Sequence, residues 1–285
     1  MFFLRRTPWL RYLLLLAAIL ALFLFFSSFW LPQRECGSAG QPCFIQRAPE
    51  PPLFPGEPVI KECPGQSFQA GRLLLHLRSS MLEEDDVLLE NYLLGWDQLI
   101  SFMESLGTMV GFFSQKVKDK VQLIRDLSLK HREGEQGQGG MCFHLLQPYR
   151  SVRTMVGAEL QRGVVSFSER SDSGCRTLLR LHRSLLWLRL LLHGLSEDQE
   201  PFKTPGELSR DAYQVALAPH HSWFLRNAAE LVFLALPDRH HFLRVVCVRD
   251  QREATPILRV IIHTLTLVHD RTQRILDQHG MLELP

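Results

Sequence analysis

The sequence predicts an all-helical domain over residues 67–285, preceded by an apolar N-terminal helix and a proline-rich linker. Three observations lead to this prediction. Residues 12–31 carry no charge, half of the 16 prolines lie within residues 32–66, and from there onward apolar residues recur mainly at spacings of three and four. That spacing places apolar side chains on one face of a helix. The chain therefore divides into residues 1–31, 32–66 and 67–285.

Residues 1–31 are predicted to be a membrane anchor or a signal segment. The uncharged run 12–31 has the length of a helix that spans a bilayer. A cleaved signal peptide is the alternative, although its apolar region is usually shorter. Arg5, Arg6 and Arg11 precede the run and favour a cytoplasmic N-terminus, which would place the domain in the lumen or outside the cell. We therefore expect a single-pass membrane protein.

Residues 32–66 are predicted to form an extended spacer, because prolines are dense and apolar periodicity is weak. Cys36, Cys43 and Cys63 lie in this spacer and can pair if the compartment is oxidising. The three cysteines of the domain are predicted to be small buried packing residues; these are Cys142, Cys175 and Cys247.

The helices of the domain are predicted from the apolar spacing, element by element. Residues 73–81 repeat leucines and a methionine at three and four residues. The next helix, 87–107, follows an acidic run, which favours a helix N-terminus, and stops at a glycine. A third helix, 110–129, ends before the glycine-rich segment 132–140. The remaining helices are expected at about 145–165, 176–195, 209–218, 222–236 and 254–279.

A short apolar run at Val245–Val248 is typical of a strand, but one such run does not build a sheet. The predicted domain is therefore entirely helical.

Composition and motifs argue against several classes of function. Lys and Arg number 32 against 30 Asp and Glu, so no long-range attraction to nucleic acid is expected. The chain contains no Cys-x-x-Cys, His-Glu-x-x-His, P-loop or Gly-x-Ser-x-Gly motif. The pairs His220-His221 and His240-His241 are adjacent and would not share a helix face as metal ligands. We expect no metal, no cofactor and no nucleic-acid partner, and an enzyme is the least favoured class.

The helix predicted at 176–195 carries a stripe of cationic and aromatic side chains. Its members are Arg176, Arg180, Arg183 and Trp187, at i, i+4, i+7 and i+11. The remaining face is nearly all leucine, so most of this helix should be buried. Two interpretations stay open. The arginines lie at an exposed edge or pair with acidic residues of a neighbouring helix, or they bind a phosphate, which matches the planar guanidinium.

A second basic pair, Lys116 and Lys120, is spaced i, i+4 and follows an apolar run that contains Phe112 and Phe113. By itself this pair is more typical of a solvated helix face.

Several motifs resemble the glycolipid transfer protein family. In chain order they are Ser105-Leu106-Gly107 followed by Phe112, Phe113, Val117 and Lys120; Ser173–Thr177 continuing to Trp187-Leu188; His221-Ser222-Trp223; and Leu282–Pro285. The resemblance extends over roughly residues 68–285. It favours the branch that binds ceramide 1-phosphate, because Arg176 stands where the glycolipid branch has a tryptophan.

The resemblance implies a two-layer helical sandwich whose apolar sleeve holds one sphingolipid, without chemistry and without a cofactor. By position, Lys120, Arg176 and Arg180 would bind the lipid phosphate. His221 would contact the lipid amide, and Trp223 would lie at the membrane-docking surface. We expect a monomer whose partners are a sphingolipid phosphate and a membrane surface. Family habit places the domain in the cytosol, against the charge rule above.

One position departs from the family pattern. The family has an aspartate four residues before the signature lysine, where it accepts the amide N–H of the sphingoid base. Here that position is Lys116, which has no acceptor. Asp119 is a candidate substitute from a neighbouring direction. The phosphate half of the predicted site is complete, whereas the headgroup and amide half, with His221 and Lys116, is altered.

Two hypotheses for the function follow. The first is an anchored protein that binds ceramide 1-phosphate and transfers it between membranes. An apolar sleeve would cover the lipid chains, since each methylene exposed to water costs about 0.8 kcal/mol. The alternative is a lipid sensor or membrane-tethering module that does not transfer lipid, and Lys116 is the residue that favours it.

Overall fold

Helices account for the regular secondary structure of the described residues, which confirms the all-helical prediction for this part of the chain. The computed structural model describes residues 58–81, 83, 85–135, 147–197 and 203–285, and for 132–135 the backbone alone. The helices are α2 (Ala70–Ser80), α3 (Leu89–Ser105), α4 (Thr108–Glu135), α5 (Val152–Gln161), α6 (Gly174–Ser196), α7 (Pro205–Ala216), the 3-10 helix η2 (Ala218–His220), α8 (Trp223–Leu234), α9 (Arg239–Val245) and α10 (Gln251–Gln278).

The strand-like run at Val245–Val248 is not a strand. Val245 is the last residue of α9 and Val246 is its C-cap, because the N–H of Val246 still bonds to a carbonyl of that helix. In the described ranges the β-type pairing is a single isolated bridge, between Leu88 and Ser151.

Side-chain caps explain where several helices begin. The Ser173 hydroxyl accepts a hydrogen bond from the Arg176 N–H and starts α6. Thr204 and Glu207 form a capping box, with proline in the first turn, so α7 begins before the predicted residue 209. A second capping box at Ser151 starts α5, which makes this helix shorter than predicted.

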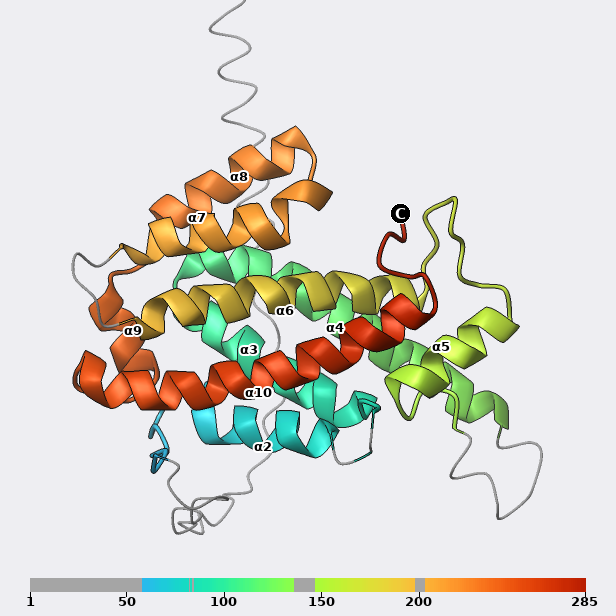
Figure 1. The fold of residues 1–285 in the computed structure, drawn as a ribbon, viewed down its shortest axis with the longest axis horizontal. Coiled ribbons are helices and arrows are strands. Elements are labelled where there is room, and N and C mark those ends of the chain that lie inside the picture. The colour runs from blue at the N-terminus through green and yellow to red at the C-terminus, as the bar shows by residue number, and fades with distance from the viewer. Residues whose placement is uncertain (1–57, 82, 84, 136–146, 198–202) are drawn as a thin grey trace, which may run out of the picture. The chain divides into compact units, whose positions relative to one another are not determined.

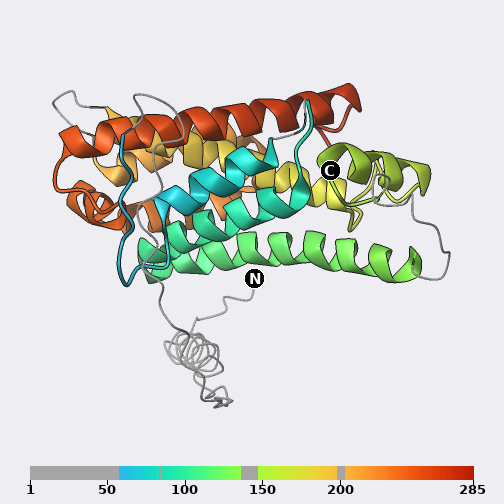
Figure 2. The ribbon, with the colours of Figure 1, turned by 90° about the horizontal axis from the view of Figure 1, so that it is seen from below.

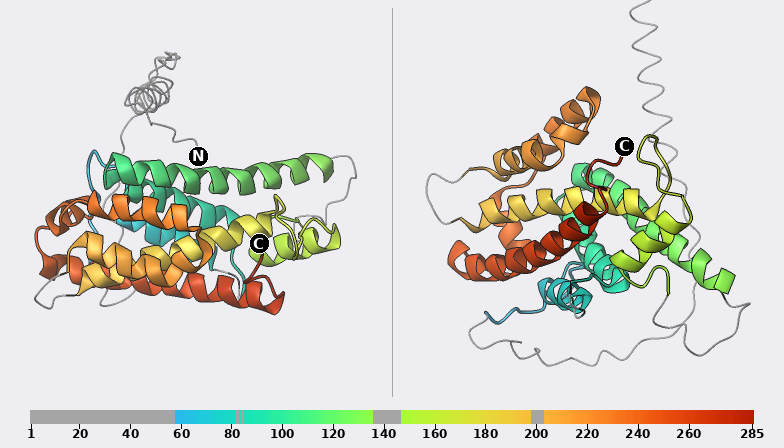
Figure 3. Two further views of the ribbon diagram at one scale, coloured as in Figure 1. Left: turned by 90° about the horizontal axis from the view of Figure 1, so that it is seen from above. Right: turned by 45° about the vertical axis from the view of Figure 1, so that its right-hand side comes forward.

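Five helices close a ring around the main apolar core. α6 contacts α10, α10 contacts α2, α2 contacts α3, α3 contacts α4, and α4 returns to α6. Figure 1 shows α6 and α10 running side by side over much of their length. Figures 2 and 3 show α10 and α4 on opposite sides of this ring. The leucine face of α6 points into the core, as predicted, and α7 and α8 pack outside it.

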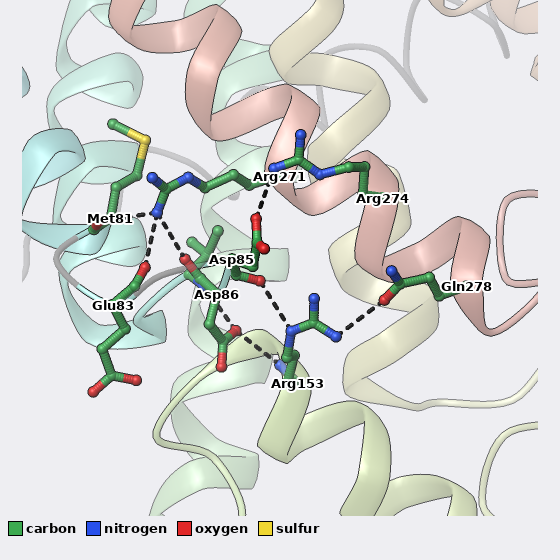
Figure 4. A network of polar contacts seen from close by, with 9 residues as sticks. Met81, Glu83, Asp85, Asp86, Arg153, Arg271, Arg274 and Gln278 are labelled. Atoms are coloured by element: carbon green, nitrogen blue, oxygen red, sulfur yellow. Dashed lines mark hydrogen bonds and ion pairs between the residues drawn. The ribbon is translucent and has the colours of Figure 1, made fainter.

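A polar network fastens the α2–α3 connection to α10 and α5 (Figure 4). One guanidinium nitrogen of Arg271, on α10, donates to the main-chain oxygens of Met81 and Glu83, each at 2.9 Å. Arg274 forms an ion pair with Asp85 at 3.1 Å. Arg153, on α5, donates to the carbonyl oxygen of Asp85 at 2.9 Å. The arginines supply donors to main-chain oxygens that a tight turn would otherwise leave unpaired.

The prediction of a transmembrane helix in this fold is corrected. In the described part of the chain, no helix is both long enough and apolar enough to cross a membrane. Residues 12–31, on which the predicted anchor depended, lie outside the described residues, as does the spacer up to residue 57. The fold class is therefore stated as all-helical alone, and the predicted single-pass localisation is dropped with the anchor.

The end of the predicted spacer lies on the domain. Cys63 is buried and forms a disulfide with Cys247, 184 residues further along the chain. The side chain of Gln69 bonds to both main-chain polar groups of Cys63, at 2.8 and 2.7 Å. The prediction that Cys247 is a simple packing residue is therefore wrong, because its sulfur reaches a segment that the periodicity did not connect to it.

The other cysteines divide by position. Cys175 is free and buried, as predicted. Cys36, Cys43 and Cys142 lie outside the described residues.

Candidate anion-binding site

The arginine stripe of α6 lies beneath the C-terminal segment of the chain. Arg176 Nε donates to the main-chain oxygen of Pro285 at 2.5 Å, and Arg180 Nη2 donates to the same oxygen at 3.3 Å. Arg183 Nη2 donates to the Leu282 carbonyl oxygen at 2.6 Å. All three side chains are half-buried. The stripe is thus neither a fully exposed edge nor a set of pairs with acidic side chains.

A buried carboxylate sets the start of α6 and so the position of Arg176. Glu159, on α5, accepts hydrogen bonds from the N–H groups of Gly174 and Cys175 at 2.6 and 2.9 Å. It also accepts one from the Tyr149 hydroxyl at 2.6 Å. Negative charge at a helix N-terminus is favourable, and here it satisfies two otherwise unpaired N–H groups.

The lysine pair of α4 approaches the same region. Lys120 is half-buried, and burial lowers its pKa, with a further lowering by the positive charge of Arg180 and a smaller one by Arg176. Its ammonium donates to the carbonyl oxygen of Lys116 at 2.9 Å. The structure therefore brings Lys120 together with Arg176 and Arg180 through the packing of α4 on α6.

Lys116 lies at the exposed edge of this cluster. Its ammonium pairs with Asp119 at 3.7 Å, and Asp119 also accepts a hydrogen bond from Gln115 at 2.9 Å. Asp119 is therefore already engaged on its own helix.

The clustered cations repel one another. Burial, followed by the charges of Arg176 and Arg183, lowers the pKa of Arg180 to about 10. Within the described residues, none of Lys120, Arg176 and Arg180 forms an ion pair with an Asp or Glu side chain. Clustered charges of one sign in a half-buried site attract a ligand of the opposite sign. The arrangement is suited to an anion.

His221 lies between η2 and α8, with its ring held by a second aromatic side chain. Its Nδ1 is 2.8 Å from the hydroxyl of Tyr213, which is buried on α7. Burial lowers the pKa of His221, and the charges of His220, Lys120 and Arg183 lower it further. The imidazole is therefore neutral at pH 7, with Nε2 free to donate if Tyr213 donates to Nδ1.

Trp223 is not part of the cationic cluster. It is the first residue of α8, and 77% of its surface is exposed. The neighbouring Phe224 is 72% exposed. Two adjacent exposed aromatic side chains form an apolar protrusion on the surface.

The sequence patterns missed two parts of this site. Tyr213 has no motif around it, and its pairing with His221 depends on the turn through η2. The bonds from α6 to the C-terminal segment join residues about 100 positions apart, and no local pattern reports such contacts. No group of three or more metal-ligating side chains occurs among the described residues.

The arrangement of helices is that of known lipid transfer proteins. The family model described as glycolipid transfer protein (GLTP) matches residues 87–248. The ceramide-1-phosphate transfer protein of Xenopus laevis is 37% identical over 224 residues, which cover 77% of this chain and 98% of the relative. The Homo sapiens protein of the same name is 34% identical, covering 76% of this chain and 97% of the relative. This chain belongs to the glycolipid transfer protein family.

Solved structures agree with this assignment. The mouse ceramide-1-phosphate transfer protein, in its apo form, aligns with a TM-score of 0.67 and 33% identity over 76% of this chain and all of its own. The human protein in complex with 12:0 ceramide-1-phosphate aligns with a TM-score of 0.64 and 34% identity, covering 75% of this chain and 97% of its own. Both relatives are named as transfer proteins.

Proposed function

We propose that this chain binds ceramide 1-phosphate and transfers it between membranes, as a carrier without enzymatic activity. The observation that carries this proposal is the cluster of Lys120, Arg176 and Arg180, drawn from two helices, with no ion pair to an Asp or Glu side chain in the described residues. A phosphate monoester supplies up to two negative charges and several acceptor oxygens to such a cluster. The names of the relatives support the same ligand.

In this proposal, different polar side chains bind different parts of the lipid headgroup. Lys120, Arg176 and Arg180 bind the phosphate oxygens. His221, kept neutral by burial and held by Tyr213, donates from Nε2 to the carbonyl oxygen of the lipid amide. Lys116 adds positive charge at the rim but cannot accept the amide N–H.

The apolar core of the helical ring would hold the lipid chains. A cavity of about 10 Å³, enough for about one water molecule, lies between α3, α6, α9 and α10, lined in part by Leu192 and Leu195. Leu195 is 15 residues along α6 from Arg180, a rise of about 22 Å. The interior is nearly filled by the protein's own side chains, so helices must separate to admit hydrocarbon.

The sharpest test of the site is Arg176→Leu, with Arg259→Leu as a matched control. Arg259 is exposed on α10 and has the same chemistry outside the cluster. We expect Arg176→Leu to weaken binding and vesicle-to-vesicle transfer of ceramide 1-phosphate at least tenfold, because a hydrogen bond to a charged group contributes about 1.5–3 kcal/mol. Transfer that is equal in the two variants would contradict the site.

Lys116 supports a second candidate function, a sensor or tether that binds lipid without transferring it. Its side chain is exposed and pairs with Asp119, so the rim of the site lacks a free acceptor on this helix. In the same assay, Lys116→Asp distinguishes the candidates. A large gain in transfer would favour the sensor, whereas efficient transfer by the unmodified chain with no gain would favour the carrier.

A further inference from the structure

The C-terminal segment Leu282–Pro285 occupies the positions at which the arginines of α6 would meet an anion. Arg176 and Arg180 converge on one oxygen, that of Pro285, at 2.5 and 3.3 Å. Two guanidinium groups that share one acceptor have the arrangement expected for an oxyanion. Arg183 holds the same segment at Leu282, at 2.6 Å.

The segment is docked and does not simply pass the site. Gly280 has a φ of +64°, which lets the chain reverse direction after α10 toward the first half of α6, where Figures 1 and 3 show the C-terminus. Met281 and Leu284 are 0% and 3% exposed and hold it against the main core. Glu283, between them, points to solvent.

The acceptors that this segment supplies are weaker than those of a phosphate. In a chain that ends at Pro285 the shared oxygen belongs to the terminal carboxylate, which carries one negative charge, whereas a phosphate monoester carries up to two and offers three terminal oxygens. The two cannot use the same donors of Arg176 and Arg180 together. The segment is thus held strongly enough to stay docked without ligand. Its bonds to the arginines are weak enough for a phosphate to replace them.

We propose that residues 282–285 are an internal competitor for the phosphate site, which a ligand must displace before Arg176 and Arg180 can bind it. This inference rests on the proposed function of the site. The competitor lowers the apparent affinity of every headgroup by the fraction of molecules in which the segment is undocked. A neutral headgroup that displaced the segment would leave the guanidinium groups without a negatively charged partner. The segment therefore restricts binding to headgroups that carry enough negative charge to replace it.

The experiment compares the full chain with a variant that ends at Leu282, using short-chain ceramide 1-phosphate as the soluble probe and titration calorimetry as the measurement. Removing Glu283–Pro285 takes the shared oxygen away from Arg176 and Arg180 and places the terminal carboxylate at Leu282, the acceptor of Arg183. We expect the shortened variant to bind the probe about tenfold more tightly. Equal or weaker binding would overturn the proposal and show that the segment positions the arginines for the ligand.

Two further variants keep the test decisive. Leu284→Ala retains every main-chain oxygen and loosens the docking, so we expect a gain of about threefold, and this variant serves if the shortened chain does not fold. Glu283→Gln retains the main-chain oxygens of Leu282 and Pro285 and the buried Leu284 side chain. The affinity of this variant for the probe should stay within about twofold of that of the full chain. A gain from Glu283→Gln as large as that from shortening would overturn the proposal, because the competitor would then be the Glu283 side chain and not the main-chain oxygen of Pro285.

Failure of the proposed function has a separate signature. If neither the full chain nor the shortened variant binds the probe, the ligand assignment is wrong. If the full chain binds and shortening brings no gain, only the internal competitor is excluded.

Discussion

At the scale of single residues, a buried histidine pair between α6 and α10 links stability to pH. His182 and His269 stack with ring centroids 4.0 Å apart, and their exposed fractions are 3% and 8%. Burial, aided by His269, lowers the pKa of His182 from 6.5 to about 3. Burial also lowers the pKa of His269, despite the hydrogen bond to Asp270.

The sign of the pH effect follows from these lowered pKa values. Below about pH 6.5 the unfolded chain binds protons at both histidines more readily than the folded chain. The stabilisation from the neutral pair is therefore fully present above pH 6.5, and the free energy of unfolding falls as the pH decreases below it. Each histidine contributes a slope of up to about 1.4 kcal/mol per pH unit. We expect His182→Gln to flatten the slope measured by denaturant unfolding between pH 6.5 and 5. The control, exposed His263→Gln, should keep the slope, and equal slopes in both variants would contradict the account.

The individual site residues differ in how far the sequence predicts them. The i, i+4 spacing places Arg176 and Arg180 on one face, and the structure places them on one oxygen. Lys120 belongs with them only because α4 packs on α6. Spacing within a helix predicts which residues share a face, but not which other helix meets that face.

At the scale of elements, α8 presents the clearest candidate surface for a membrane. Its first two residues, Trp223 and Phe224, are both more than two-thirds exposed, and the Ser222 cap fixes where the helix starts. Aromatic rings contribute a large apolar area and suit the boundary between lipid and water.

We therefore expect the double substitution Trp223→Ala, Phe224→Ala to reduce binding to vesicles at least tenfold, as measured by co-sedimentation, because each ring buries a large apolar area in the interface. Binding of short-chain ceramide 1-phosphate in solution should stay within about twofold, since both rings are largely exposed and neither carries a charge for the phosphate. Leu267→Ala, an exposed apolar position on α10, is the control. A loss of vesicle binding no larger than that of the control would count against α8 as the docking element.

Apolar periodicity does not predict where several of the helices begin or end. α7 begins at Pro205 because of a capping box, and α5 begins at Val152 for the same reason. Both signals are in the sequence, but they lie outside the periodic run. Residues 245–248 are expected to resemble a strand, but they span the last residue of α9 and the turn after it; a four-residue apolar run is too short to show a period.

At the scale of the whole described unit, one covalent bond ties the segment before α2 to the turn after α9. The Cys63–Cys247 disulfide closes a loop of 184 residues, with Cys63 buried against the domain. Cross-links across long loops restrict the unfolded chain, and loss of a native disulfide typically costs about 2–5 kcal/mol.

Reduction should therefore lower the melting temperature of the full chain, measured by differential scanning calorimetry with and without reductant. Cys63→Ser should melt at the lower temperature in both conditions, because it cannot form the bond. Thiol labelling provides an independent check, since Cys63 and Cys247 should resist alkylation until reductant is added. Identical melting of the oxidised and reduced full chain would argue against a stabilising role for this disulfide.

The sequence by itself determined the helical character of the domain, the buried leucine face of α6 and the register of its arginines, because each depends on neighbours within one or two turns. Tertiary structure alone decided that Lys120 lies near Arg180, that Tyr213 holds His221, that Cys63 reaches Cys247, and that the C-terminal segment covers the arginines. Local spacing specifies the face that a helix must bury, whereas the partner of that face depends on how all the helices pack at once. The cationic residues can therefore be identified from the sequence, but the C-terminal segment that competes for them cannot.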